Sequence, residues 1–124
     1  MSSAIVLFAH GSRDPLWRAP IDAVAQAIAA QSPDAVVRCA FLELTTPDLP
    51  TVMNELVCLG LGHVRIVPMF LGVGRHARED LPELVTQLQS QHPAVHLELM
   101  PSVGEHPAMT ALMAQIALGT HTNT

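Results

Sequence analysis

Tyrosine is absent from this sequence, and aromatic residues make up only 3% of its 124 residues. Single-stranded nucleic acids are usually bound by rows of aromatic side chains, so this scarcity argues against such a ligand. The formal charge of −5 at pH 7 argues against unspecific binding to DNA or to anionic lipid. We therefore expect neither nucleic acid nor membrane as a partner, although a local basic pocket remains compatible with this charge.

Cysteine is also scarce, and Cys39 and Cys58 form no CxxC pair. Both lie in apolar surroundings, so we expect two buried thiols in a reducing compartment. The first residues lack a basic segment ahead of an apolar one, which argues against a signal peptide. The longest apolar run, 64–73, contains Arg65 and is shorter than the about 20 residues that a bilayer requires. The sequence therefore predicts a cytoplasmic protein.

Several motifs of well-known enzymes are missing. There is no GxSxG nucleophile elbow, no Walker loop, no HExxH and no cysteine-histidine zinc cluster. Gly72-Val73-Gly74 lacks the third glycine of a dinucleotide fingerprint. His10 is not preceded by the arginine that a phosphohistidine phosphatase would use. No nucleotide cofactor is expected.

Apolar runs with strand character alternate with segments of helical periodicity along the whole chain. Four such pairs predict an α/β fold with three layers, in which a four-stranded parallel sheet carries helices on both faces. We expect one domain over residues 1–124, with a polar tail from about residue 119 that frays. The expected strands cover 4–9, 35–42, 64–70 and 95–99, and the expected helices cover 14–31, 46–59, 77–91 and a segment from 107.

Prolines mark where these helices begin. Thr46 and Pro47 look like the cap and first-turn proline of the second helix, and Pro82 suits the first turn of the third. Pro20 is awkward, because it either kinks the first helix or marks its true start. In the last helix, Leu112, Met113 and Ile116 are expected to face the core.

Polar, reactive side chains follow the ends of three predicted strands. His10, Glu43 and His76 come after the first, second and third strands, so a parallel sheet would bring all three to one edge. Two imidazoles and a carboxylate suit a divalent transition metal, and they also suit proton removal near neutral pH. Taken singly, each residue could equally be a solvated side chain at the end of a strand. Their common edge favours function.

Other candidates surround this edge. Gly11 allows the backbone to turn after His10, and Ser12 is able to cap the next helix. The loop Leu71-Gly72-Val73-Gly74 contains two glycines and is a candidate for a moving lid. Three of the six basic residues flank the edge and suit a ligand with carboxylates, or serve solubility alone: Arg13, Arg75 and Arg78.

The remaining histidines carry less weight. His106 follows the fourth strand and is a candidate for a second tier of the pocket. We interpret the others as structural or solvated: His63, His92, His96 and His121.

Three motifs in order along the chain resemble the CbiX family of sirohydrochlorin chelatases. They are the segment 7–13 (LFAHGSR), the segment 40–44 (AFLEL) with Pro47, and the segment 67–71 (VPMFL) continuing to His76 and to Asp80-Leu81-Pro82. The resemblance covers about residues 5–116, and the length resembles the short form of the family. It implies a chelatase (flavodoxin-like) half-domain that pairs as a homodimer, which would also cover the edges of a small sheet.

The resemblance further implies insertion of a divalent metal, Co²⁺ first and Fe²⁺ or Ni²⁺ as alternatives, into a tetrapyrrole without ATP. It assigns the metal to His10 and His76 and an acidic partner to Glu43. Either Glu43 or an imidazole not bound to the metal could accept pyrrole protons. The substrate's carboxylates would meet the three arginines, while Leu44, Leu71 and Val73 would line its faces. Ser12, Gly72 and Gly74 are also expected to contact the substrate.

Two other functions remain compatible with these residues. A metal or tetrapyrrole carrier could use the same edge without turnover. A small flavodoxin-like interaction domain could carry the histidines incidentally.

Overall fold

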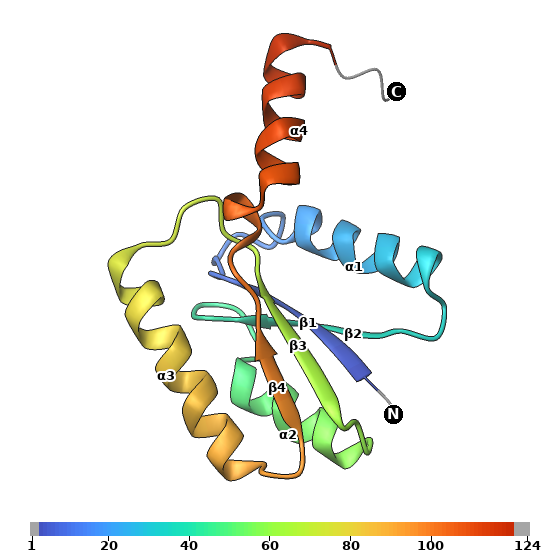
Figure 1. Cartoon of the computed structure of the whole chain (residues 1–124), viewed down its shortest axis with the longest axis vertical. Helices are drawn as coiled ribbons and strands as arrows, with labels where there is room; N and C mark the ends of the chain where they lie inside the picture. Colours follow the sequence, from blue (N-terminus) through green and yellow to red (C-terminus); the bar gives the residue numbers. More distant parts are fainter. Residues whose placement is uncertain (1–2, 121–124) are drawn as a thin grey trace.

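The computed structural model describes residues 3–120 and contains the predicted four-stranded parallel sheet. The strands lie in the order β2-β1-β3-β4, as Figure 1 shows. The strands are β1 (Ser3–Ala9), β2 (Val36–Phe41), β3 (His63–Pro68) and β4 (His96–Leu99). The helices are α1 (Ala19–Gln31), α2 (Leu49–Cys58), α3 (Arg75–Gln91), the short 3₁₀ helix η1 (Val103–Glu105) and α4 (Pro107–Leu118).

The main core lies between the sheet and the helices α2 and α3. Alternate strand residues such as Val6, Phe8, Val64 and Ile66 are buried there, as expected for side chains that share one face of a sheet. Helix α1 lies on the opposite face, over β1 and β2, so the three-layer α/β fold is confirmed. Among residues 3–120, none of the helices combines the length and apolar composition that a membrane span needs.

The beginnings of the helices differ in part from the sequence-based expectation. Helix α1 starts only at Ala19, with Pro20 in its first turn, so Pro20 marks the true start. The expected cap at Thr46 and Pro47 is wrong. Asp48 caps α2 by accepting a hydrogen bond from the Thr51 amide, while the Pro47 carbonyl accepts one from the Phe41 amide at 2.9 Å.

Two further expectations about burial and helix position are corrected. Helix α3 starts at Arg75, so Pro82 lies inside this helix rather than in its first turn. Cys58 is exposed and Cys39 half-buried, so the expectation of two buried thiols is wrong. Burial raises the pKa of the Cys39 thiol.

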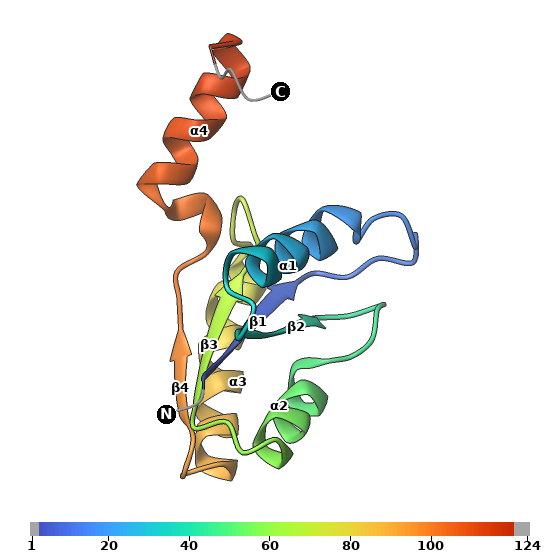
Figure 2. The ribbon, with the colours of Figure 1, turned by 90° about the vertical axis from the view of Figure 1, so that its right-hand side faces the viewer.

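Helix α4 departs most from the expected architecture. It projects beyond the end of the sheet instead of lying on it (Figures 1 and 2). None of its residues is buried, so the predicted core positions Leu112, Met113 and Ile116 do not enter this chain's own core. His121 and most of the tail expected to fray lie outside the described residues.

Candidate functional site

The loops that follow β1 and β2 are joined at the carboxyl edge of the sheet. The Leu42 amide donates to the Ala9 carbonyl, and the Glu43 amide donates to the His10 carbonyl, both at 2.9 Å. The backbones of His10 and Glu43 are therefore neighbours although 33 positions separate them in the chain. This proximity follows from the parallel pairing of β1 with β2, in which Ala9 lies opposite Phe41.

Gly11 is required where these two loops meet. Its φ is 100°, a conformation that residues with a side chain rarely adopt. A Cβ atom built on Gly11 would collide with the Glu43 carbonyl oxygen. The absence of a side chain at Gly11 therefore permits the close approach of the His10 and Glu43 segments.

Thr45 adds a second link between the loops, and the sequence reading did not single it out. Its Oγ1 accepts a hydrogen bond from the Ser12 amide and donates one to the Ser12 carbonyl, each at 2.9 Å. Ser12 itself does not cap α1, because its Oγ accepts from the Asp14 amide and α1 begins only at Ala19, seven residues after Ser12. A hydroxyl at residue 45 carries no sequence signal for this role, because its partner comes from another loop.

The loop from Glu43 to Thr45 turns sharply. The Thr45 amide donates to the Glu43 carbonyl at 2.7 Å, across Leu44. Leu44 has a φ of 64°, which is unfavourable for a residue with a side chain. Among the residues that the structure describes, no other non-glycine residue has a positive φ. The turn leaves the Leu44 side chain exposed at the edge of the sheet.

The His10 imidazole lies against the ring of Phe70, another residue that the sequence reading missed. The two ring centroids are 4.3 Å apart, with 37° between the ring planes. Phe70 is itself buried, and it follows β3, whose end is held to β1 by a 2.7 Å bond from the Met69 amide to the Phe8 carbonyl. The sequence offered one signal for this role, an apolar residue directly after a buried strand, and that signal is equally typical of a residue of the hydrophobic core. Phe70 thus supports one face of an otherwise exposed imidazole.

His76 lies in the first turn of α3, close in sequence to the end of β3. Its side chain lies outside the described part of the structure. The structure therefore brings His10 and Glu43 together at the carboxyl edge of the sheet, as predicted. The position of the His76 imidazole at this edge stays a prediction. Among the described side chains, no three His, Cys, Asp or Glu groups are assembled into a metal site.

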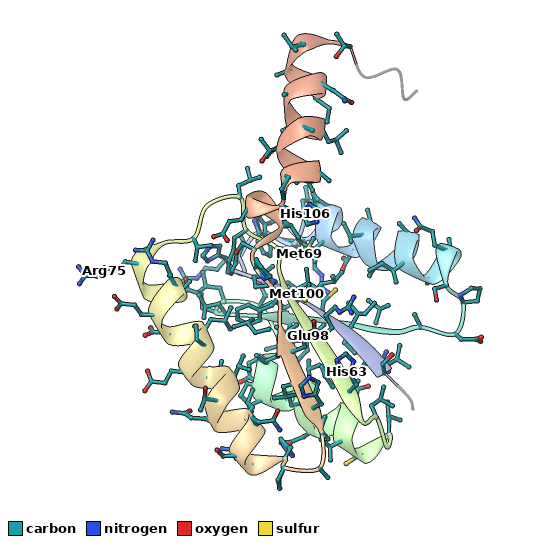
Figure 3. The ribbon with its side chains drawn as sticks, viewed as in Figure 1. His63, Met69, Arg75, Glu98, Met100 and His106 are labelled. Atoms are coloured by element: carbon teal, nitrogen blue, oxygen red, sulfur yellow. The ribbon has the colours of Figure 1, made fainter. Side chains whose placement is uncertain are left out.

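The three candidate arginines are arranged differently from one another. Arg78 helps to line a hollow of about 160 Å³ together with Phe70 and Val73. Arg75 pairs with Glu79 at 3.3 Å and extends away from the body of the molecule (Figure 3). Arg13 is exposed in the loop after β1.

The loop 71–74 is open to solvent. Leu71 is 70% exposed, and a Cβ atom on Gly72 or Gly74 would meet no atom within 4 Å. A side chain at either position would therefore meet no neighbouring atom, whereas a side chain at Gly11 would collide with the Glu43 carbonyl. This openness leaves room for the loop to move, as the lid hypothesis requires.

Exposed leucines surround the edge that carries His10. Water-exposed apolar side chains of this size gather where an apolar ligand or partner binds. Those on the loops after β1, β2 and β3 are Leu16, Leu42, Leu44 and Leu71. Leu16 and Leu42 were not predicted as site residues.

Comparison with known proteins identifies the family of this chain. The CbiX family model matches residues 4–118. The chain is 30% identical over 88 residues to a sirohydrochlorin cobaltochelatase from Methanococcus aeolicus, and 30% identical over 104 residues to a sirohydrochlorin ferrochelatase from Bacillus subtilis. These alignments cover 71% and 84% of this chain but 62% and 40% of those proteins, so this chain spans less than two thirds of each.

A solved structure agrees over nearly the full length. The chain superposes on a CbiX protein from Marinobacter aquaeolei VT8 with a TM-score of 0.81 and 28% identity. The superposition covers 94% of this chain and 95% of that one. The family match over residues 4–118 and the agreement with this solved structure show that this chain belongs to the CbiX family.

Proposed function

We propose that this protein is a chelatase that inserts a divalent metal ion into sirohydrochlorin or a related tetrapyrrole without ATP. The relatives that this chain matches include sirohydrochlorin cobaltochelatases and a sirohydrochlorin ferrochelatase, which supports sirohydrochlorin as the substrate. Cobalt is our first choice of metal, with iron and nickel as alternatives. The sequence contains no Walker loop for a nucleotide.

One observation carries the proposal: the His10 imidazole rests on buried Phe70, beside the backbone of Glu43, on an edge bordered by exposed leucines. A tetrapyrrole is wide, flat and apolar on its faces, with carboxylates at its rim. Leucines suit the faces, and an imidazole with one supported face keeps its ring nitrogens free for a metal ion.

The reaction has a simple balance. A divalent ion enters the macrocycle, two pyrrole N–H bonds break, and two protons leave. In our proposal His10 and His76 hold the incoming ion as nitrogen ligands, which bind a borderline ion without the permanence of a thiolate cluster. Glu43, which is exposed at the edge, accepts a proton, and an imidazole released from the ion can accept the other.

The surrounding residues would bind the macrocycle. Arg13, Arg75 and Arg78 would pair with carboxylates, for which Arg75 must leave Glu79, an exposed ion pair of small energy. Ser12 holds its loop in place, and Leu44 with the loop 71–74 would cover the apolar faces. We further propose that the chain acts as a homodimer.

The test is metal insertion measured by the absorbance of sirohydrochlorin with Co²⁺, Fe²⁺ and Ni²⁺ in parallel. We expect His10→Ala and His76→Ala to lower the rate about 100-fold or more, with unchanged circular dichroism, because each removes a metal ligand. His92→Ala is the matched control, since His92 caps the far end of α3. Wild-type rates in the His10 and His76 variants would reject the assigned site.

Turnover separates the enzyme from a carrier that uses the same edge. With substrate and metal in fiftyfold excess over protein, an enzyme converts the whole pool faster than the same mixture reacts without protein. A carrier would stop after one equivalent, and that result would reject the proposed chelatase.

A further inference from the structure

The chain segment directly after β3 is held on both sides by backbone hydrogen bonds. On the side of β1, the Met69 amide donates to the Phe8 carbonyl at 2.7 Å. On the side of β4, the Gly104 amide donates to the Phe70 carbonyl at 2.9 Å. Consecutive residues of this segment are therefore tied to opposite neighbours, and the connection that follows β4 holds the backbone of Phe70.

Gly104 lies in the 3₁₀ helix η1, in the connection between β4 and α4, and Figure 1 shows this connection beside the loop that follows β3. A Cβ atom on Gly104 would collide with the carbonyl oxygen and the Cα atom of Leu71. Unlike Gly11, Gly104 has no positive φ, and residues with side chains adopt the backbone conformation of a 3₁₀ helix. Glycine is therefore needed at position 104 for the space that it leaves to Leu71, not for its own backbone conformation.

The ring of Phe70 connects this anchored backbone to His10. An edge-to-face contact joins it to the buried ring of Phe8, with 6.2 Å between the ring centroids and 74° between the ring planes. The exposed His10 imidazole packs against the same Phe70 ring at 4.3 Å. A shift of the Phe70 backbone would therefore move the ring that supports the imidazole.

Side-chain packing alone does not fix the position of Phe70. This residue borders a hollow of about 160 Å³, which it lines together with Val73, Pro101 and Ser102. Close packing on all sides would hold an aromatic ring in place, whereas a neighbouring hollow leaves the ring room to shift. The hydrogen bond from Gly104 therefore contributes a restraint on Phe70 that a fully packed ring would not require.

We propose that Gly104 is a positioning residue for metal insertion. Its missing side chain lets η1 approach Leu71 and hold the Phe70 carbonyl, and the Phe70 ring in turn sets the position and tilt of the His10 imidazole. Gly104 touches neither the ion nor the macrocycle and acts through Phe70. This inference rests on the proposed function, which takes His10 as a ligand of the incoming ion.

Gly104→Ala should disturb this arrangement without removing any proposed ligand. The added methyl group must push the Leu71 backbone away, and Phe70, its neighbour in the chain, moves with it. Because a small misplacement of a reacting group slows a reaction strongly, we expect kcat for insertion to fall about tenfold at saturating sirohydrochlorin. Leu71→Ala is the matched control, since it removes a proposed substrate contact but keeps the backbone, and it should act by raising KM.

NMR of the His10 ring tests the positioning directly, in protein without metal or substrate. An aromatic ring shifts the resonances of protons that lie over its face, so the His10 ring signals report the distance and tilt of Phe70. His10→Ala assigns these signals by their loss, and Phe70→Leu gives their positions without the ring. We expect Gly104→Ala to move the signals from the wild-type positions toward those of Phe70→Leu, and Leu71→Ala to leave them in place.

A second variant covers the case in which Gly104→Ala does not fold. Val103→Gly loosens η1 without adding atoms, and it should move the His10 signals in the same direction by a smaller amount. Val95→Ala, a change at a buried residue before β4, controls for lost stability and should leave the signals and kcat unchanged.

Unchanged His10 signals in the folded variants would overturn the proposal, as would shifted signals with a wild-type kcat. The failure of the proposed function is a separate result. If His10→Ala itself inserts metal at the wild-type rate, the assigned site is rejected, while the NMR signals still decide whether Gly104 positions the His10 ring.

Discussion

Thr45 and Ser12 hold each other through two hydrogen bonds of 2.9 Å, one to the amide and one to the carbonyl of Ser12. A single threonine hydroxyl thereby joins the loops that carry His10 and Glu43. The shape of the candidate site thus depends on a residue with no proposed contact to the substrate.

Thr45→Val should lower the free energy of unfolding by about 1–3 kcal/mol, because it keeps the side-chain shape and leaves the Ser12 amide and carbonyl without partners. We also expect a lower insertion rate, since the His10 loop loses its anchor. Urea unfolding and the insertion assay measure both effects. Thr46→Val, a change at an exposed neighbour, is the control, and equal effects in the two variants would contradict this role for Thr45.

Gly11→Ala should be among the more damaging glycine substitutions. The added methyl group meets the Glu43 carbonyl, and the φ of 100° is itself unfavourable for alanine, so we expect a loss of about 2 kcal/mol or more. Thermal unfolding measures this loss.

Gly72→Ala is the matched comparison, because a methyl group there has open space. Its stability should stay within about 0.5 kcal/mol of the wild type. If the loop 71–74 acts as a lid, this variant should still slow turnover by reducing backbone freedom. Unchanged turnover would reject the lid.

Phe70→Leu tests whether the aromatic support of His10 matters for the reaction. The ring lies 4.3 Å from the imidazole, so its loss should free the imidazole and reduce insertion about tenfold in folded protein. Phe41→Leu is the control, because Phe41 is equally buried but contacts Trp17 and Arg18 instead. Metal titration followed by NMR of the His10 ring separates a positioning effect from a loss of stability. Equal insertion rates in both variants would contradict the role of Phe70.

Asp48 provides a pH-dependent contribution to stability. Hydrogen bonds from Thr51 lower the pKa of the Asp48 carboxyl below its ordinary value of 3.8. The stabilisation is therefore fully present above the ordinary pKa and is lost as the pH falls through the lowered one. Asp48→Ala should cost about 1 kcal/mol at pH 7, and the gap to the wild type should close below about pH 4. Asp48→Asn is the control, because its amide oxygen can still accept the Thr51 hydrogen bond but does not titrate, so its gap to Asp48→Ala should not change with pH.

Local patterns were sufficient for much of this structure. Strand and helix periodicity predicted all four strands and the main helices to within a few residues at most ends. The helix starts were harder, because Thr46-Pro47 and Asp48 with Pro50 are both reasonable caps. The Pro47 carbonyl is bonded to Phe41 at the end of β2, so the helix begins after it.

The amino-acid sequence by itself determined that polar residues follow apolar strands and that these strand ends share one edge, because parallel strands align their carboxyl ends. Only the tertiary structure decided how that edge is held. Gly11 against Glu43, Thr45 on Ser12 and Phe70 beneath His10 are contacts between segments more than 30 positions apart, and no periodicity encodes them. The direction of α4 was likewise decided there, because an apolar pattern states that a helix must be covered but not which surface covers it.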